Sequence, residues 1–573
     1  MKTQQLLNYE RDRWIAGEGG LAELSSAIDG SPVALAGSGG LDFGAMLRHA
    51  REVGGPALRK MTFHERARML KGLALAIMEK KEALYELSYQ TGATRKDGWI
   101  DIEGGAGTLF SFSSKGRREL PDAHVLLDGA LEPLSKGGSF VGQHIYSPLQ
   151  GAAVHINAFN FPVWGMLEKL APTLLAGVPA IVKPASATSY LTEAAFRVMI
   201  DSGLLPNGAV QLIVGGVGDL FDHLTGQDVV SFTGSAATAY KLRTHPVVMR
   251  ESVRFIAEQD SLNASILGPD AAPGTPEFDL FVREVAVEMT VKAGQKCTAI
   301  RRAMAPAEYL DALEEALRDR LAKTRVGDPR SEDTRMGALV STAQCKDVRA
   351  KIAELQAAGA RIVAGDPDAE PPIAGGAFLP PVLLRTDDPW GTGAVHDVEP
   401  FGPVSTIMPY RDLDDAIALA NRGRGSLALS LFTHSPEVAR DFVLGAASFH
   451  GRMLVIDRDN AKESTGHGSP LPVLVHGGPG RAGGSEEMGG VRGVKHYMQR
   501  TALQSSPAML AAITGQFIPG APKHVISTHP FRLKMSELSI GDTWKTGSRT
   551  VSIEDIEHFA HFTGDKFYAH MDE

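Results

Sequence analysis

The hydrophobic positions of the chain change their spacing near residue 150. Before that point the clearest pattern runs from Thr62 to Thr91, where apolar residues such as Leu70 and Ile77 recur at helical spacing and predict an amphipathic helix. From residue 150 onward short apolar runs alternate with helical segments, and residues 275–505 repeat this alternation. Such alternation is typical of parallel sheets whose strands are joined by helices, so we expect an α/β fold.

The first alternating region predicts a doubly wound nucleotide-binding sheet. The strand GAAVHINAF leads to a helix that begins at Pro162 and ends at Gly177, since proline fits a first helical turn and glycine ends one. Further strands are expected in VPAIVK, VQLIV and VVSFTG, with a helix over 188–201. No GxGxxG follows a first strand, and GGVGDL at 215–220 resembles that fingerprint only superficially.

The later part of the chain predicts a second α/β region and a separate C-terminal unit. We expect helices at 277–293 and 310–324, strands near 361–363 and 427–432, a glycine-rich loop at 466–490, a terminal strand in VKHYMQRTAL and a linker at 505–522. Thr528 then begins a new unit that contains the helical segment SIEDIEHFAHFTGD. Loops as long as the glycine-rich one tend to be functional or mobile in compact proteins.

Composition narrows the class of protein. A chain of 573 residues suggests about three domains, and 43% hydrophobic and 22% charged residues describe an ordinary globular protein. The net charge of -9 argues against nucleic acid as the main partner. Charges come too early in MKTQQLLNYERDRW for a secretory signal, and no apolar run is long enough for a membrane span. Two cysteines and no export signal indicate a reducing cytoplasm.

The stretch VKAGQKCTAIRR carries Cys297, one of the two cysteines. A thiol that attacks an electrophile needs space beside the sulfur and a tightly turning backbone, which Gly294 can provide. Isolated cysteines are most often buried and unreactive, and this alternative holds for Cys297 when it is considered alone. Cys345, in the exposed-looking helix start STAQCKD, is assigned no role.

Four further motifs place polar groups at predicted strand ends. Asn160 in NAFNFP has an amide that can hold an oxyanion, and Lys183 in IVKPAS is a cation where a phosphate or ribose would lie. Gly234 and Ser235 in FTGS offer backbone donors suited to a diphosphate, and Glu258 ends an apolar strand as a candidate base. Each has a structural alternative: the amide and the serine can be helix caps, the lysine solvated and the glutamate half of an ion pair.

In this order, FNFP, VKPA, FTGS, a strand-terminal glutamate, GQKCTA and EPFGPV resemble the aldehyde dehydrogenase superfamily over roughly residues 1–505. The resemblance implies a domain that binds NAD(P) without the usual fingerprint, a catalytic domain and an oligomerisation flap. The expected parts are a cofactor domain at 1–257 without a flap segment at 130–150, a catalytic domain at 258–489, a flap strand at 490–505, a linker at 506–522 and the C-terminal unit at 523–573. Relatives with such a flap are at least dimers, so a homo-oligomer is expected.

The same resemblance implies roles for single residues. Cys297 would form a thiohemiacetal with an aldehyde, Asn160 and the backbone N–H of Cys297 would hold the oxyanion, and Glu258 would activate the water that hydrolyses the thioester. Cofactor contacts would come from Lys183 at the adenosine ribose, Gly234 and Ser235 at the diphosphate, and Glu399 and Phe401 at the nicotinamide ribose. No metal site is expected.

The chain departs from the family pattern at three places. NAD-preferring members usually have a glutamate after VKPA that grips the ribose 2′-hydroxyl, where this chain has Ser186. A carboxylate would repel a 2′-phosphate, whereas a serine beside Lys183 accommodates it, so we expect NADP to be preferred over NAD. SAATAY lacks the second glycine expected after FTGS, and QDS replaces the usual Leu-Gly-Gly after Glu258. Both changes affect the expected diphosphate and nicotinamide contacts.

The segment FAHFTGDKFYAHMD (559–572) resembles the active-site signature of hot-dog-fold, R-specific enoyl-CoA hydratases. In that family an aspartate and a histidine activate water across a C=C bond, and here they would be Asp565 and His570. The segment 523–573 is too short for a hot-dog domain, and strands without partners leave backbone groups unsatisfied. We therefore expect a partial α+β hot-dog unit without hydratase activity.

The order of the two units resembles bifunctional enzymes of phenylacetate degradation, in which an oxepin-CoA hydrolase domain follows a dehydrogenase domain. This implies oxidation of a CoA-linked semialdehyde to an acid with NADP. Four alternatives remain: a related dehydrogenase of benzoyl-CoA degradation, a hydratase with a scaffold domain, a non-catalytic member, and an acylating variant. The presence of Cys297 and Glu258 speaks against the last two. His467 and His476, in the glycine-rich loop, could touch substrate, though solvated loop histidines are commoner.

Overall fold

The computed structural model describes residues 4–565, which form two compact units. Among the described residues, the larger unit is made of 4–126 and 146–500, and the smaller one of 127–145 and 501–565. His570, expected to act in the C-terminal unit, lies outside the described residues. No helix within 4–565 combines the length and the apolar character needed to cross a membrane.

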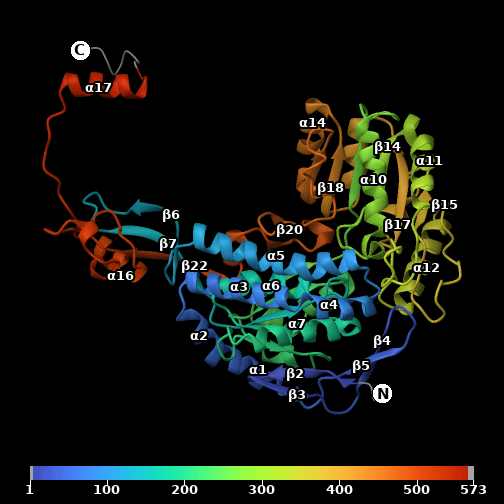
Figure 1. Ribbon diagram of the computed structural model, residues 1–573, viewed down its shortest axis with the longest axis horizontal. Helices are drawn as coiled ribbons and strands as arrows, with labels where there is room; N and C mark the ends of the chain where they lie inside the picture. Colours follow the sequence, from blue (N-terminus) through green and yellow to red (C-terminus); the bar gives the residue numbers. More distant parts are fainter. Residues whose placement is uncertain (1–3, 566–573) are drawn as a thin grey trace. The chain divides into compact units, whose positions relative to one another are not determined.

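The first sheet of the larger unit confirms the predicted parallel arrangement of its central strands, and Figure 1 labels its antiparallel strands β2 and β3. Its strand order is β12-β11-β8-β9-β10-β2-β3, in which the first five strands are parallel and β2 and β3 extend the sheet antiparallel. The bounds are β2 (Leu7–Glu10), β3 (Arg13–Ala16), β8 (Ala153–Ile156), β9 (Ala180–Lys183), β10 (Val210–Leu212), β11 (Val229–Thr233) and β12 (Arg254–Glu258). The crossover helices are α6 (Trp164–Ala176), α7 (Ser189–Asp201), α8 (Ala236–Arg243) and α9 (Pro246–Arg250).

A second seven-stranded sheet lies in the same unit, with the order β15-β16-β17-β14-β13-β18-β19. All neighbouring strands are parallel except the edge pair β15 and β16. The strands are β13 (Ala264–Leu267), β14 (Arg302–Pro306), β15 (Arg361–Ala364), β16 (Val382–Arg385), β17 (Val404–Tyr410), β18 (Ser426–Phe432) and β19 (His450–Ile456). The helices of this region are α10 (Pro276–Thr290), α11 (Leu310–Leu321), α12 (Thr342–Ala357), α13 (Leu413–Asn421) and α14 (Pro436–Ala446).

Three further helices, α3 (Phe63–Glu79), α4 (Lys81–Ser88) and α5 (Arg95–Glu119), pack with α6 over the first sheet. The single helix expected from Thr62 to Thr91 is therefore two, because Lys80 leaves the helical conformation. Capping boxes begin α3 and α5, which satisfies amide donors that the first turn leaves without partners. The remaining N-terminal elements are β1 (Gln4–Gln5), β4 (Ala22–Ser25), β5 (Pro32–Ala36), α1 (Phe43–His49) and α2 (Gly55–Arg59).

The glycine-rich segment 466–490 is more ordered than a loop. It contains an antiparallel hairpin of β20 (Val475–Gly478) and β21 (Ser485–Met488), followed by the short helix α15 (Val491–Lys495). The predicted terminal strand is shorter than expected for this reason and begins only at Met498, in β22 (Met498–Ser505). Cys345 is likewise not exposed, because it faces the core of the second sheet from α12.

The smaller unit is built around the sheet β22-β7-β6, with β6 (Leu126–Pro133) and β7 (Val141–Pro148). The expected linker after β22 instead contains α16 (Pro507–Thr514), whose Leu510 and Ala511 pack on Val141 in a small apolar core. Ser506 caps this helix and Gly515 ends it in a left-handed conformation. The small residues of this segment favour a linker by composition alone, but alanine is also a good helix former.

The expected hot-dog segment forms one helix, α17 (Ile553–Thr563), capped by Ser552. The only strands within the described part of 523–573 are the two-residue pair β23 (His524–Val525) and β24 (Asp542–Thr543). Phe559 and Phe562 on α17 are 65% and 86% exposed. The helix of the hydratase-like motif is thus present without a sheet against its apolar side chains.

Arg302, at the start of β14, provides a test of how the second sheet is held together. Its buried guanidinium donates to the carbonyls of Leu262, Leu419 and Ala420. Replacement by alanine leaves these buried acceptors unsatisfied, so we expect Arg302→Ala to destabilise the fold by more than about 3 kcal/mol. Thermal unfolding measures the effect, with Arg440→Ala, at an exposed helical arginine, as a control that keeps the wild-type Tm. An unchanged Tm in Arg302→Ala would contradict the prediction.

Candidate active site

Cys297 follows a backbone turn that ordinary residues rarely adopt. Lys292, Ala293 and Gly294 have φ angles of 54°, 50° and 65°, so three successive residues are left-handed. A Cβ on Gly294 would lie 2.2 Å from the carbonyl oxygen of Gly402, which excludes any side chain there. Left-handed residues other than glycine cost roughly 1–3 kcal/mol each and persist only where surrounding contacts hold them. The helix predicted to reach residue 293 ends at Thr290 for this reason.

Side chains from neighbouring elements hold the Cys297 backbone in place. The amide of Asn263 donates to the carbonyls of Cys297 at 2.8 Å and Ala299 at 2.9 Å. The guanidinium of Arg301 donates to Gly402 at 2.7 Å and to Gly294 at 2.9 Å, which ties the turn to the EPFGPV motif. These contacts were not expected from the sequence, where Asn263 and Arg301 stand in no recognised motif.

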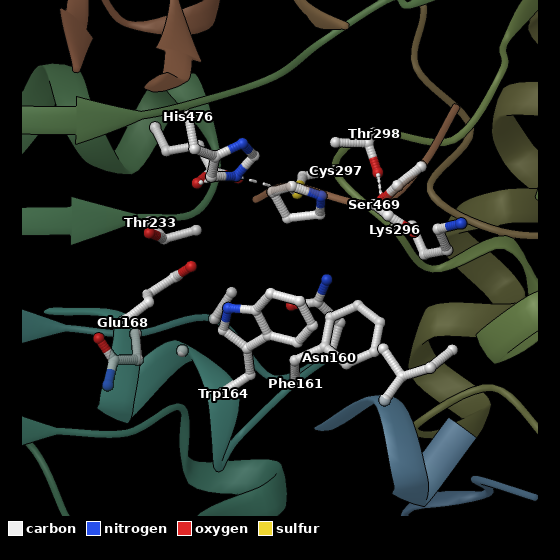
Figure 2. A pocket seen from close by; sticks show the side chains of 17 residues that line it. Asn160, Phe161, Trp164, Glu168, Thr233, Lys296, Cys297, Thr298, Ser469 and His476 are labelled. Carbon is white, nitrogen blue, oxygen red and sulfur yellow. Dashed lines mark hydrogen bonds and ion pairs between the residues drawn. The ribbon is translucent and has the colours of Figure 1, made fainter. Parts of the chain in front are cut away.

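A cavity of about 80 Å³ opens beside Cys297 (Figure 2). Its lining includes Ile100, Asn160, Phe161, Trp164, Glu168, Thr233, Glu258, Lys296, Cys297, Thr298, Ser469, Pro470 and His476. Figure 2 shows Trp164 and Phe161 on one side of the cavity, opposite Cys297 and His476. Aromatic walls facing a polar group are typical of small-molecule sites.

Three residues that the sequence motifs single out meet at this cavity. Cys297, Asn160 and Glu258 come from separate segments, and all three line it. The Nδ2 atom of Asn160 donates to the carbonyl of Gln295, two residues before the cysteine, at 3.1 Å. This contact orients the amide toward the cysteine loop and leaves its second N–H for another acceptor. The structure therefore brings Asn160 to the loop that carries Cys297.

His476 is the residue whose importance the sequence did not reveal. It lies in β20, is 3% exposed, and its Nε2 stands 3.0 Å from Oε2 of Glu258 and 3.9 Å from Sγ of Cys297. Burial opposes a charge on the imidazole, but the Glu258 carboxylate outweighs it and raises the pKa of His476. Neither this histidine nor His467, which is also buried, is a solvated loop residue. The pairing of β20 with β21, which buries His476, is the feature that the glycine-rich sequence did not indicate.

The carboxylate and the thiol have pKa values displaced in opposite directions. Burial acts to raise the pKa of Glu258, yet His476 and Lys169 lower it below its ordinary value. Burial, followed by the charge of Glu258, raises the pKa of Cys297 well above its ordinary value. The resting pair is therefore a carboxylate beside a neutral thiol, and a base within reach is needed to form the thiolate.

A group of buried charges extends from the cavity wall into the protein. The Nζ atom of Lys169 is 2.9 Å from Glu487, 3.7 Å from Glu168 and 2.7 Å from the hydroxyl of Thr233. Burial raises the pKa of Glu168 to about 8, although Lys169 opposes the shift. Two acids therefore share one buried cation next to the candidate base. No sequence motif pointed to this group.

The expected cofactor residues lie at the carboxyl ends of β9 and β11 and beside the cysteine loop. Lys183 ends β9 half-buried, burial lowers its pKa, and the exposed Ser186 begins the following turn. Gly234 donates its N–H to the Glu258 carbonyl, while Ser235 caps α8. The N–H of Ala236 in that first turn is taken by the carboxylate of Asp260 at 2.9 Å, a contact that the family pattern did not predict.

Glu399 and Phe401 lie together near Ser261. The N–H of Ser261 donates to Oε2 of Glu399 at 3.0 Å, and burial raises the pKa of this carboxyl to about 7 despite Arg301. Its other oxygen, Oε1, is buried and has no hydrogen-bond partner among the described residues. The ring of Phe401 packs edge-on against Phe159 at 5.7 Å. A buried acceptor of this kind suits a ribose hydroxyl.

Asp565 belongs to the smaller unit, whereas Cys297, Asn160 and Glu258 belong to the larger one. Asp565 is exposed just after α17. Its expected partner His570 is among residues 566–573, outside the described part. The structure therefore brings together Cys297, Asn160 and Glu258, and it does not test the pair in the C-terminal unit.

The fold and comparisons with known proteins place this chain among the α/β oxidoreductases. The chain belongs to the aldehyde dehydrogenase family, whose model matches residues 14–499, so the expected family membership is confirmed. It is 45% identical over 479 residues to 3,4-dehydroadipyl-CoA semialdehyde dehydrogenase of Aromatoleum evansii, covering 83% of this chain and 93% of the relative. It is also 53% identical over 239 residues to Protein MaoC of Klebsiella aerogenes, covering 42% of this chain and 70% of that protein.

Solved structures show the same fold at lower identity. Betaine aldehyde dehydrogenase of Staphylococcus aureus in complex with NAD+ superimposes with a TM-score of 0.77 at 22% identity, covering 88% of this chain and 96% of that one. PnpE in complex with nicotinamide adenine dinucleotide gives a TM-score of 0.76 at 24% identity, covering 88% and 98%. The α/β aldehyde dehydrogenase fold expected for the main part of the chain is thereby confirmed.

Gly294 offers a test of the turn that carries Cys297. Gly294→Ala would place a Cβ against the Gly402 carbonyl, so we expect the cysteine to shift and aldehyde oxidation to fall by more than about a hundredfold. Gly203→Ala is the matched control, because its φ of 66° is nearly the same while no atom lies within 4 Å of the added Cβ. That control should lose only about 1–2 kcal/mol of stability and keep its activity. Equal activities in the two variants would contradict this account of the turn.

Proposed function

We propose that this chain oxidises the aldehyde group of a CoA-linked semialdehyde to a carboxylic acid with NADP, as a step of phenylacetate degradation. The observation that carries the proposal is the meeting of Cys297, Asn160 and Glu258 at one cavity in a chain of the aldehyde dehydrogenase family. The name of the Aromatoleum evansii relative supports a CoA-linked semialdehyde as the substrate class.

The first half of the proposed reaction forms a bond between Cys297 and the aldehyde. The thiol proton passes to Glu258 as sulfur adds to the carbonyl carbon, and Asn160 with the backbone N–H of Cys297 stabilises the resulting oxyanion. The aromatic walls formed by Phe161 and Trp164 exclude water from the adduct at this stage. Loss of hydride from the adduct leaves a thioester on Cys297.

The second half releases the product. Glu258 first releases the thiol proton to solvent and then accepts a proton from water as the water oxygen attacks the thioester carbonyl, and the Cys297 sulfur leaves as it takes that proton from Glu258. An acylating enzyme would transfer the acyl group to CoA instead and would need no such base. The place of Glu258 beside the thiol supports hydrolysis.

The residues present fit a nicotinamide dinucleotide. Oε1 of Glu399 is buried, lies 3.7 Å from Nε of Arg301 and makes no hydrogen bond among the described residues, and the Lys183 ammonium makes no ion pair among them. These two residues would hold the ribose groups, with Phe401 beside the nicotinamide, and Ser235 near the diphosphate. When bound, the cofactor supplies the hydride acceptor. The exposed Ser186 supports NADP, because its hydroxyl can donate to a 2′-phosphate.

Two CoA-linked semialdehydes, which differ in their acyl chain, are candidates for the substrate. The C-terminal motif supports 3-oxo-5,6-dehydrosuberyl-CoA semialdehyde, the substrate class of bifunctional enzymes that carry a hydratase-like domain. The alternative, 3,4-dehydroadipyl-CoA semialdehyde, is favoured by the relative that covers 83% of this chain. Relative kcat/KM for the two thioesters decides between them.

For the partial hot-dog unit we propose no hydratase activity, since α17 exposes Phe559 and Phe562. For β6, β7 and β22 we propose the role of an oligomerisation flap.

Cys297→Ala tests the proposed function directly. We expect NADPH formation from a CoA-linked semialdehyde to fall to background, because no other residue at the cavity offers a thiol. Cys345→Ser is the control, since the second cysteine lies in the core of the other sheet region and should leave turnover unchanged. Mass spectrometry of the wild type, quenched soon after mixing with substrate and NADP, should show an acyl adduct on Cys297. Undiminished NADPH formation in Cys297→Ala would refute the assignment.

Ser186→Glu tests the cofactor preference. A carboxylate beside the 2′-phosphate adds like-charge repulsion, so we expect the KM for NADP to rise at least about tenfold while the KM for NAD falls. Ser331→Glu adds the same charge at an exposed serine outside the first sheet and should change neither value. Initial rates with each cofactor measure the effect. A wild-type preference for NAD would sink the proposal for NADP and leave the oxidation itself intact.

A further inference from the structure

His476 touches both of the residues to which the proposed function assigns proton transfer, and the inference drawn from it rests on that function. Its Nε2 faces Oε2 of Glu258 at 3.0 Å and Sγ of Cys297 at 3.9 Å. One reactive atom of each of the three side chains lies within 4.8 Å of the others. A thiol, an imidazole and a carboxylate thus form one compact group at the cavity wall.

We propose that His476 is a positioning residue, whose Nε2–H holds the Glu258 carboxylate beside Cys297 so that a single base serves both halves of the reaction. Glu258 stands at the end of β12 with a flexible side chain, and its Oε1 has no hydrogen-bond partner among the described residues. The bond from His476 therefore fixes one carboxylate oxygen and leaves the other to accept a proton. Without this bond the carboxylate can rotate away from the sulfur.

The charges around His476 explain why an imidazole serves better here than a neutral donor. Glu168 and Lys169 face the group from α6, Glu487 from β21, and Glu258 from β12. Carboxylates outnumber cations in this enclosed space, and a protonated His476 offsets one of them. The raised pKa of His476 agrees with that charge balance.

Proton transfer within the group leaves its total charge unchanged. Before the reaction the group holds a thiol, a carboxylate and an imidazolium. The S–H bond then breaks, an O–H bond forms on Glu258, and the thiolate is left beside the imidazolium of His476. No net charge is created in the buried cavity, so the thiolate forms at a smaller electrostatic cost than it would beside a neutral residue.

Other buried histidines of the chain show what a purely structural role looks like. His155 meets the hydroxyl of Thr173 at 3.1 Å, and His467 meets that of Ser430 at 2.8 Å. Burial lowers the pKa of both, so they remain neutral and fill space with one hydrogen bond. His476 differs because its partners are an acid and a thiol that line the cavity.

Alkylation of Cys297 by iodoacetamide tests the proposal without substrate or cofactor. A Cys345→Ser background makes Cys297 the only cysteine. We expect His476→Phe to slow alkylation near neutral pH by roughly ten- to a hundredfold and to move the thiol titration to higher pH. His476→Gln, which keeps an N–H donor but no charge, should show the same titration shift.

Transient kinetics separate positioning from charge. With a CoA-linked semialdehyde and NADP, His476→Phe should give a burst of NADPH followed by steady-state turnover that is about a hundredfold slower, because the thioester waits for an ill-placed base. His476→Gln should recover most of that steady-state rate through its remaining donor. His467→Gln is the control from the same segment and should match the wild type in both assays.

The outcomes separate this proposal from the proposed function. Unchanged alkylation and unchanged turnover in His476→Phe would overturn it. Equal losses in the Phe and Gln variants and in His467→Gln, with a lowered Tm, would overturn it as well, since they indicate a structural role. If alkylation depends on His476 as expected but the wild type never reduces NADP with a semialdehyde, the positioning of Glu258 stands and the proposed substrate fails.

Discussion

The structure of the site depends on the left-handed turn from Lys292 to Gly294. This turn has unfavourable backbone angles at two residues that carry side chains, and it exists because contacts made elsewhere hold it. The N–H of Lys292 donates to Asp97 of α5 at 2.8 Å, and its ammonium donates to Thr91 at 2.9 Å. Arg301 ties the far end to Gly402. The position of the Cys297 sulfur is therefore set jointly by both sheet regions of the larger unit.

Because the turn is held from both sides, the cavity is rigid where the chemistry needs it. The carbonyls of Cys297 and Ala299 are both bound by Asn263, which leads into β13, and Gln295 bonds to the backbone of Val340 at 3.0 Å. A sulfur that is held in this way can be approached by a carbonyl from the open side only. Attack requires the sulfur and the carbonyl carbon to be held roughly 3 Å apart, and a fixed cysteine backbone helps to meet that requirement.

The two sheet regions and three residues of the cavity could be predicted from the sequence, because each depends on a local pattern. The two α/β regions follow from local periodicity, which reports burial directly, as in the runs that became β8, β9 and β11. Asn160 and Glu258 stand in recognisable motifs after strands of one parallel sheet, whose carboxyl ends meet at one edge, and Cys297 is recognisable from its own GQKCTA motif. Local patterns and a fixed topology were sufficient for these residues.

The failures arose where the deciding contact is distant in the chain. The glycines around His476 favour a loop, yet β20 pairs with β21 and brings this histidine to Glu258, more than two hundred positions earlier. Lys169 follows Glu168 on a mostly apolar helix, and only the fold shows its second partner Glu487. Cys345 looked exposed because its neighbours are polar, although its own face of α12 is apolar. The segment after β22 is rich in small residues, and only its packing on Val141 shows that α16 belongs to a core.

Buried charge connects the catalytic residues with the network behind them. Oxygen atoms of Glu168, Glu258 and Glu487 lie within 4.8 Å of one another, with Lys169 among them. Three ionised acids around one ammonium would be unstable in an enclosed space, so the cluster must hold additional protons. The pKa of Glu168, raised to about 8 chiefly by burial, indicates where one proton resides at neutral pH. A second positive charge on His476 then allows Glu258 to stay ionised beside Cys297. Glu258 can therefore accept the proton of Cys297, because the protons of this cluster lie on Glu168 and His476.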